Sequence, residues 1–151
     1  MKGLGLLLVL ATFLFSCGKS PYYNTSYAFE NQTWSQDLMP KFEVDIQDTS
    51  QLYDFEIFLR NTTDYAHSNL FIYLQSFAPD GSNGRKAYEI PIADEKGQWL
   101  GTKSGTLVEN VLKFKQRKFP LKGKYTFKIE LGITEKEMKN ISDIGLRITA
   151  L

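Results

Sequence analysis

The sequence predicts an all-β protein, a single antiparallel β-sandwich domain of about eight strands, with a partly closed barrel as the alternative. Apolar and polar residues alternate with a period of two in several stretches, which is the pattern of strands with one buried face. Turn-forming pairs that contain glycine separate these stretches, and aromatic residues make up 14% of the chain, as is common in strands. The chain is long enough for one domain with a substantial core and too short for two.

The expected strands follow one another with short connections. Residues 41–47 alternate throughout, and residues 53–60 do so with Phe58 among the polar positions. Residues 70–74 are continuously apolar, which predicts a central strand covered on both faces. Alternation returns at residues 124–131 and 144–148, which predicts strands with one solvent-exposed face. The turn signals between strands are Pro79-Asp80-Gly81, Asn83-Gly84, Lys96-Gly97 and Lys122-Gly123.

Two segments in the second half of the chain are less regular. Residues 101–109 are predicted to form a glycine-rich loop that leads into a strand over residues 111–119. Thr134 is followed three residues later by Glu137, which is the spacing of a capping box. This spacing predicts a short helical turn within residues 134–140.

The N-terminus has the pattern of a bacterial lipoprotein signal. Lys2 supplies a positive charge, Leu4 to Phe15 form a short apolar run, and Ser16 precedes Cys17, the only cysteine. The apolar run is too short to cross the roughly 30 Å hydrocarbon core of a bilayer as a helix. The alternative is an ordinary secretory peptide with a coincidental cysteine. The expected division of the chain is a lipoprotein signal peptide at 1–16, a lipidated tether at 17–25 and the β-sandwich domain at 26–151.

Lipid attachment at Cys17 makes the membrane an expected partner. Each buried methylene contributes about 0.8 kcal/mol, so two or more acyl chains hold a protein durably without a spanning helix. Lipidation would also modify the only cysteine, so the domain must be stable without a disulfide. Basic and acidic side chains balance once Lys2 is removed from the 18 basic residues and 17 are compared with the 17 acidic ones. This balance does not favour nucleic acid as a partner.

The sequence offers little material for catalysis. His67, the only histidine, lies near Asp64 in a polar stretch, but consecutive loop residues point in different directions and do not make a triad. His67 has no second histidine for a metal site, and Asp80 and Asp94 lack the closely spaced oxygens that calcium needs. We therefore expect a protein that is not an enzyme and has no cofactor or metal.

Trp34 and Trp99 each allow two interpretations. Trp99 follows the turn at Lys96-Gly97, which can aim a large side chain either under a loop or toward solvent. A tryptophan that caps the core is one interpretation. An exposed platform that binds protein or glycan is the other.

The segment Arg60-Asn61-Thr62-Thr63-Asp64-Tyr65-Ala66-His67-Ser68-Asn69-Leu70-Phe71 resembles the GldH family of gliding-motility lipoproteins. The likeness continues in order along the chain in Tyr27-Ala28-Phe29, Trp34, Pro79-Asp80-Gly81, Trp99-Leu100-Gly101, Phe119-Pro120 and Ile141-Ser142-Asp143-Ile144-Gly145-Leu146-Arg147. The resemblance implies a non-enzymatic part of the envelope machinery that moves surface adhesins and is tied to type IX secretion. It implies other envelope proteins of that machinery as partners, and it carries over no catalytic or ligand residues.

The polar cluster in the first of these segments has two possible roles. Asn61 and Asn69 can bond to neighbouring backbone, and Arg60 can pair with Asp64, which would fix a loop. Contact with a partner is the alternative, because polar residues on a rigid loop are common at interfaces. The candidate interaction residues are Arg60, Asn61, Asp64, Tyr65, Asn69 and Trp99.

The leading functional interpretation is an envelope protein that acts through protein contacts. A glycan-binding module is an alternative, and it would need two or more exposed aromatic residues on one sheet face. A glycosidase or peptidoglycan-active enzyme is another, and it would need a cleft with two suitably spaced carboxylates. Gly18 and Lys19 do not form an acidic export tract after Cys17, which favours a periplasm-facing position over display on the cell surface.

Overall fold

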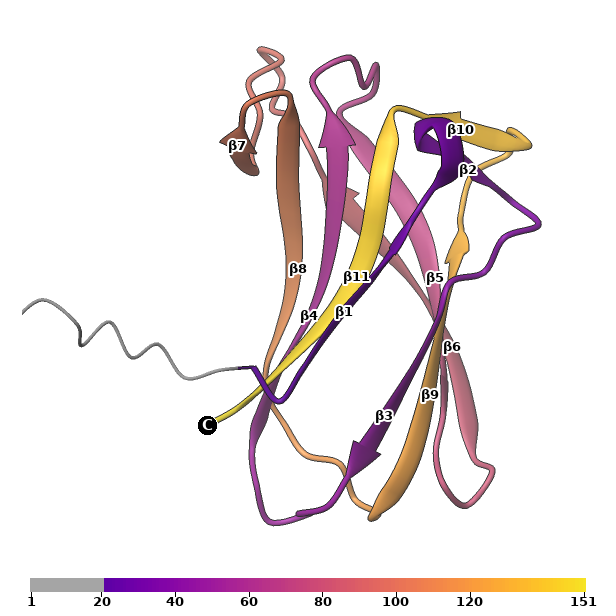
Figure 1. The fold of residues 1–151 in the computed structure, drawn as a ribbon, viewed down its shortest axis with the longest axis vertical. Helices are drawn as coiled ribbons and strands as arrows, with labels where there is room; N and C mark the ends of the chain where they lie inside the picture. The colour runs from indigo at the N-terminus through magenta and orange to yellow at the C-terminus, as the bar shows by residue number, and fades with distance from the viewer. Residues whose placement is uncertain (1–20) are drawn as a thin grey trace, which may run out of the picture.

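The computed structural model describes residues 21–151, which form a β-sandwich of two antiparallel sheets (Figure 1). One sheet has the strand order β1-β11-β4-β8-β7 and the other has the order β3-β9-β5-β6, while β2 and β10 pair separately. The elements are β1 (Tyr23–Ala28), η1 (Glu30–Gln32), β2 (Thr33–Ser35), β3 (Lys41–Ile46), β4 (Tyr53–Thr62), β5 (Asn69–Phe77), β6 (Asn83–Pro91), β7 (Thr102–Ser104), β8 (Leu107–Arg117), β9 (Gly123–Leu131), β10 (Glu137–Lys139) and β11 (Ile141–Ala150). The prediction of an all-β sandwich is confirmed.

Strand pairing defines two ends of the sandwich. β1 begins where β11 ends, because Tyr23 lies opposite Ile148. The β3–β4 and β8–β9 connections lie at the same end, since Tyr53 is beside both Ala150 and Arg117. The register of the other sheet places the β5–β6 connection there as well. We call this the terminal end, in the lower part of Figure 1, and we call the opposite end the distal end.

The core lies between the sheets and follows from the alternation in the sequence. The inward residues of β4 and β9 are buried and most of their outward residues are polar. Rings from the two sheets meet near the terminal end, where Phe55 lies 5.0 Å from Phe127 between ring centroids. Phe119, from the β8–β9 connection, lies 5.4 Å from Tyr53 and 4.9 Å from Tyr125. Such ring pairs contribute about 0.5–1.5 kcal/mol each beyond their buried area, so they hold the sheets together.

The prediction of a helical turn within residues 134–140 is wrong. Residues 137–139 form β10, which pairs with β2 and places Met138 opposite Trp34. These two side chains are 8% and 0% exposed. A capping bond contributes about 1 kcal/mol, whereas burying two large apolar side chains contributes roughly 3–6 kcal/mol in total. Tertiary pairing therefore decides the conformation of this segment.

The expected loop at residues 101–109 contains ordered strands. β7 pairs with β8, which begins at Leu107 and ends at Arg117, so the prediction of a strand over residues 111–119 is displaced by several residues. Gly105 makes the turn with φ of 60°, a conformation that costs glycine little. The alternation of β8 is hidden in the sequence because Asn110 is polar and faces inward.

β5 is an interior strand, but only one of its faces is covered. Phe71 on the outer face is 45% exposed, so the expectation of cover on both faces is wrong. The apolar run arises because aromatic side chains occupy the outer positions of this strand. The signal at Asn83-Gly84 lies inside β6, and residues 78–82 make the turn with Gly81 at φ of 85°.

The folded part begins slightly earlier than the sequence indicates. β1 starts at Tyr23, so the last three residues of the expected tether belong to a sheet. The signal peptide at 1–16 and Cys17 lie outside the described residues. Within residues 21–151, no helix is long and apolar enough to cross a membrane.

Candidate functional site

The β4–β5 connection, residues 63–68, lies at the distal end and contains the middle of the polar cluster. Its backbone is held by neighbouring segments of the chain. Hydrogen bonds between backbone N–H and carbonyl groups, 2.8–2.9 Å long, join the pairs Thr62–Asn140, Thr63–Thr106 and Ile92–Ser68. Asn140 Nδ2 also donates to the backbone oxygen of Asp64 at 3.0 Å. Contacts with three other connections therefore fix this loop.

Tyr65 points from this connection into the molecule. Its side chain is 5% exposed, and its hydroxyl donates to the backbone oxygen of Asn69 at 3.0 Å. Burial raises the pKa of the Tyr65 phenol above its usual value. The expected bond from Asn69 to neighbouring backbone is wrong, because Asn69 Nδ2 donates to Glu89 Oε1 on β6 at 2.7 Å. Tyr65 thus supports the loop from inside.

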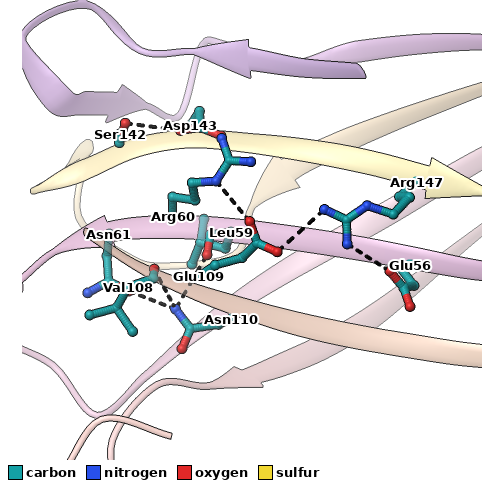
Figure 2. Close-up of polar contacts among 10 residues, drawn as sticks. All are labelled: Glu56, Leu59, Arg60, Asn61, Val108, Glu109, Asn110, Ser142, Asp143 and Arg147. Carbon is teal, nitrogen blue, oxygen red and sulfur yellow. Dashed lines mark hydrogen bonds and ion pairs between the residues drawn. The ribbon is translucent and has the colours of Figure 1, made fainter. Parts of the chain in front are cut away.

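Asn61 forms a buried amide pair with Asn110 (Figure 2). Asn110 Nδ2 donates to Asn61 Oδ1 at 2.7 Å, and Asn61 Nδ2 donates to the backbone oxygen of Thr62 at 2.8 Å, as the sequence suggested. Asn110 Oδ1 has no hydrogen-bond partner among the described residues. A Cβ at Gly101 would lie 2.6 Å from this oxygen and 2.3 Å from the backbone oxygen of Glu109. The polar pair therefore requires glycine at position 101.

Arg60 lies on the outer face of the five-stranded sheet (Figure 2). Its Nε donates to Glu109 Oε2 on β8 at 2.9 Å, and its Nη1 donates to Asp143 Oδ1 on β11 at 3.0 Å. The expected pair with Asp64 is wrong, because alternation turns Arg60 outward while Asp64 lies beyond the end of β4. Burial alone would lower the pKa of Arg60, but the bonds to Glu109 and Asp143 outweigh burial and raise it.

The ion pairs continue along this outer face. Arg147 on β11 donates to Glu109 at 3.4 Å and to Glu56 on β4 at 3.0 Å. Lys113 on β8 lies 2.9 Å from Glu56 and 3.3 Å from Asp54, and these two carboxylates raise the pKa of Lys113. A single exposed ion pair contributes only about 0–1 kcal/mol. The network links three neighbouring strands, so its main effect is on their register.

A buried ring lies within this network. Phe58 is on the outer side of β4 yet only 1% exposed. The guanidinium carbons of Arg60 and Arg147 lie 5.0 Å and 4.9 Å from its ring centroid. Gly145 on β11 makes room for the ring, because a Cβ there would come within 2.1 Å of Phe58 Cζ. This cluster was not predicted from the sequence, although Phe58 stands out among the charged outward residues of β4.

The two tryptophans have different environments. Trp34 is fully buried, stacks on Phe29 at 4.9 Å and donates from Nε1 to the backbone oxygen of Leu38 at 2.9 Å. Trp99 is half-buried against the core. Its neighbour Leu100 is 57% exposed. Core capping therefore describes Trp34, whereas Trp99 combines partial burial with an accessible edge.

Two connections at the distal end are joined by backbone hydrogen bonds from Ile92 and Ala93 to Ser68, and both carry accessible side chains. Asp64 and His67 come from the β4–β5 connection, and Trp99 and Leu100 come from the β6–β7 connection. We call these four residues the distal surface. Its chemistry suits contact with a macromolecule, because it combines an exposed leucine, a half-buried tryptophan and hydrogen-bonding groups. Among residues 21–151, no three His, Cys, Asp or Glu side chains gather as a metal site would require.

Comparison with solved structures gives only a loose likeness. The VP2 subviral particle of infectious bursal disease virus superposes on 85% of this chain and 33% of its own, with 15% identity and a TM-score of 0.38. This value is too low to support an argument about function.

Comparison with known sequences covers nearly the whole chain. Residues 21–148 match the profile of the GldH lipoproteins. A protein of Christiangramia forsetii described as a gliding motility lipoprotein GldH homolog is 30% identical, over 94% of this chain and 92% of its own. The gliding motility lipoprotein GldH of Flavobacterium johnsoniae is 27% identical, over 98% of this chain and 96% of its own. The resemblance noted in the sequence is thus confirmed, and the chain belongs to the GldH lipoprotein family.

Proposed function

We propose that this protein is a lipid-anchored, non-enzymatic component of the gliding-motility machinery and its type IX secretion apparatus. The near full-length match to gliding-motility lipoproteins carries the proposal. The lipoprotein pattern that ends at Cys17 supports attachment to a membrane. Gly18 and Lys19 after this cysteine support a domain that faces the periplasm.

The distal surface is the proposed place of contact with other envelope proteins of the machinery. Leu100 offers exposed apolar area beside Trp99, and binding energy at interfaces concentrates in a few such residues. The backbone around Asp64 is held by hydrogen bonds to neighbouring segments, so little ordering is needed on binding. Among the earlier candidates, Arg60, Asn61, Tyr65 and Asn69 are engaged in contacts within the domain, which shifts the proposal to Asp64, His67, Trp99 and Leu100.

Complementation of a deletion strain tests the contact. Leu100→Asp should abolish colony spreading and adhesin secretion while the protein accumulates normally, because it puts a charge into the proposed interface. Met39→Asp is the matched control, since Met39 is 46% exposed in the β2–β3 connection, at the sheet edge opposite β6. The control should retain both phenotypes.

Two results would contradict the proposal. Normal spreading and secretion with Leu100→Asp and with Trp99→Ala would remove the distal surface as a contact. Loss of both phenotypes from a single Asp or Glu substitution outside the distal surface, at normal protein level and fold, would indicate chemistry instead of contact.

A glycan-binding role is a second candidate, favoured by the outer face of the four-stranded sheet. Phe71, Tyr73 and Phe77 all take outward positions on β5. An open groove of about 560 Å³ is lined by Phe71, Tyr73, Arg85 and Glu130, among others. The Arg85 guanidinium stacks 3.6 Å from the Tyr73 ring centroid, so Phe71, 45% exposed, is the platform for a sugar ring. The face thus provides one exposed ring of the two that such a module needs.

Cosedimentation with purified peptidoglycan tests this second role. Native protein should cosediment and Phe71→Ala should bind about two- to tenfold more weakly, since stacking on a ring contributes about 0.5–1.5 kcal/mol. Val111→Ala is the control for loss of an exposed apolar side chain. Equal binding by all three proteins would exclude the Phe71 platform.

A further inference from the structure

A cavity opens between the two sheets at the terminal end. Its volume is about 510 Å³, within the usual range of pockets that hold small ligands. The cavity exists because two paired strands carry small residues, not large apolar ones, at neighbouring inward positions. Ser76 on β5 lies opposite Gly84 on β6, and both positions face the core, where larger apolar residues stand farther along each strand.

The interior of the cavity is largely aromatic. Phe114 lies 5.0 Å from Tyr88 and 5.8 Å from Phe55 between ring centroids, and these three rings form one wall. Phe119 and Tyr125, from the β8–β9 region, line the part nearest the terminal end. These walls suit a hydrocarbon chain, which gains free energy from apolar contact and needs no hydrogen bonds.

Cations surround this aromatic interior. Lys86, Arg117 and Lys118 line the cavity, and Lys115 and Lys122 are near Arg117 and Lys118 in the sequence, on β8 and the β8–β9 connection. All five are exposed, and none forms an ion pair with a carboxylate of residues 21–151. Lys115 and Lys122 do interact at longer range with Asp54 and Asp48, respectively. Arg117, Lys118 and Lys86, whose ammonium lies 5.6 Å from the Tyr88 ring centroid, line the cavity without a carboxylate partner and can face a ligand with negative charge.

The carboxylates at the terminal end are already engaged locally. Asp48 accepts from the backbone and hydroxyl of Ser50, and Asp80 does the same with Ser82. Asp54 accepts from a backbone N–H and pairs with Lys113. These bonds leave the carboxylates charged, but none of the three carboxylates forms an ion pair with Lys86, Arg117 or Lys118.

The length of the tether places this end at the bilayer. Cys17 precedes Pro21 by four residues, and an extended chain covers at most about 3.6 Å per residue, so the thioether lies within about 14 Å of the domain. β1 leaves the sandwich at the terminal end. The cavity mouth and its cations would then face the lipid headgroups.

We propose that the cavity binds an anionic phospholipid of the membrane that holds the protein. The phosphate lies against Lys86, Arg117 and Lys118, and an acyl chain enters between the aromatic walls. The free cations favour a phospholipid over the acyl chains on Cys17, which carry no phosphate. This inference rests on the proposed lipid attachment at Cys17 for the nearness of the bilayer. Binding in this way would hold the distal surface away from the membrane.

Vesicle binding by an unlipidated chain tests the charge requirement. All strands of the sandwich lie within residues 21–151, so a chain from residue 17 with Cys17→Ser keeps the whole domain, and a cooperative urea transition checks its folding. This chain should sediment with phosphatidylglycerol vesicles and not with phosphatidylcholine vesicles. Lys86→Gln with Arg117→Gln and Lys118→Gln should weaken binding by about 100-fold, since each cation contributes about 1 kcal/mol near an anionic surface.

A matched variant at the distal end controls for net charge. Lys96→Gln, Lys103→Gln and Lys136→Gln remove the same charge from three exposed residues, and this variant should bind as the parent chain does. Equal binding to both kinds of vesicle, or equal weakening by the two triple variants, would overturn the proposal. Palmitate labelling of Cys17 is a separate measurement, so failure here does not depend on whether the anchor exists.

A soluble short-chain lipid tests the cavity itself. Dihexanoyl phosphatidylglycerol below its micelle concentration should bind the parent chain one to one in calorimetry, and Ser76→Leu should weaken this binding at least tenfold by filling the cavity. Gly84→Val is a second filling variant, because a Cβ at Gly84 meets only Ser76 Oγ, at 3.6 Å. Unchanged affinity in both folded variants would show that the lipid does not enter the cavity.

Discussion

At the scale of single residues, the packing on the outer face of the five-stranded sheet depends on the Phe58 ring and on the absence of a side chain at Gly145. Phe58 is buried on a face that would otherwise be solvated, because Arg60 and Arg147 cover it and Gly145 leaves space beneath it. An aromatic ring over a cross-strand glycine protects backbone that glycine leaves bare. The two arginines are in turn held by Glu109, so packing and charge support each other.

Gly145→Ala should destabilise the domain by about 1–3 kcal/mol, because the new methyl group would overlap the Phe58 ring and force it out of place. Urea unfolding measures the loss. Phe58→Leu with Gly145→Ala should lose less than the sum of the two single changes, since the smaller side chain relieves the overlap. Strict additivity of the two changes would contradict this account of the contact.

Tyr65 gives the domain a predictable response to alkaline pH. Its folded-state pKa is raised by burial, so the unfolded chain releases the phenolic proton first, from about pH 10. The Tyr65 phenol should therefore leave the free energy of unfolding independent of pH below about pH 10, and this free energy should fall as the pH rises above that value. Tyr65→Phe should be about 1 kcal/mol less stable at neutral pH, through loss of the bond to Asn69, and should show a weaker alkaline decline.

Urea midpoints between about pH 8 and pH 11 test this prediction. Tyr53 keeps part of the decline in the variant, because burial also raises its pKa. Parallel pH profiles for the parent and Tyr65→Phe would show that Tyr65 does not cause the effect.

At the scale of elements, the short pair of β2 and β10 closes the distal end of the core. Trp34→Ala should cost about 3–5 kcal/mol, because it empties a fully buried site and removes the stacking on Phe29. Trp99→Ala should cost clearly less, since Trp99 is half-buried. Urea unfolding of both variants compares them directly. Equal losses would contradict the different environments of the two side chains.

Several elements could be predicted from the sequence because their apolar residues alternate. β3 and β9 bury every second residue, and β4 and β11 do so with additional buried positions such as Phe58 and Gly145, so the pattern identifies both the strand and its inner face. β10 and β7 could not be found in this way. Each has only three residues, too few to show a pattern. β10 forms because it pairs with β2, which is distant in sequence, and β7 forms because it pairs with β8 across a short turn.

The candidate site was harder to predict than the fold. Tyr65 and Asp64 are neighbours in the sequence, yet one is buried and the other exposed, and only the tertiary contacts of the loop decide which. Arg60 was proposed as an interaction residue, but it binds Glu109 and Asp143 on other strands of its own sheet. The order of strands in a sheet cannot be deduced from local sequence. Leu100 belongs to a segment that resembles the family, but nothing in the sequence indicates that its side chain is exposed.

At the scale of the whole molecule, the proposed anchor and the proposed contact surface lie at opposite ends of the sandwich. Cys17→Ala should abolish incorporation of radiolabelled palmitate, because no other thiol in the chain can accept the lipid. The control is Ser20→Ala, which leaves the thiol intact. Labelling that persists in Cys17→Ala would refute the lipoprotein assignment.

The pairing of β1 has a mechanical consequence if the protein acts under load as proposed. β1 is an edge strand that follows directly after the tether, and all six of its residues pair with β11, from Tyr23 opposite Ile148 to Ala28 opposite Asp143. If the bilayer holds the tether while a moving partner pulls on the distal surface, the tension runs along the length of β1. The hydrogen bonds between β1 and β11 are then strained together in shear, not peeled apart one after another. The domain can therefore carry a pulling force without unravelling from the strand that joins it to its anchor.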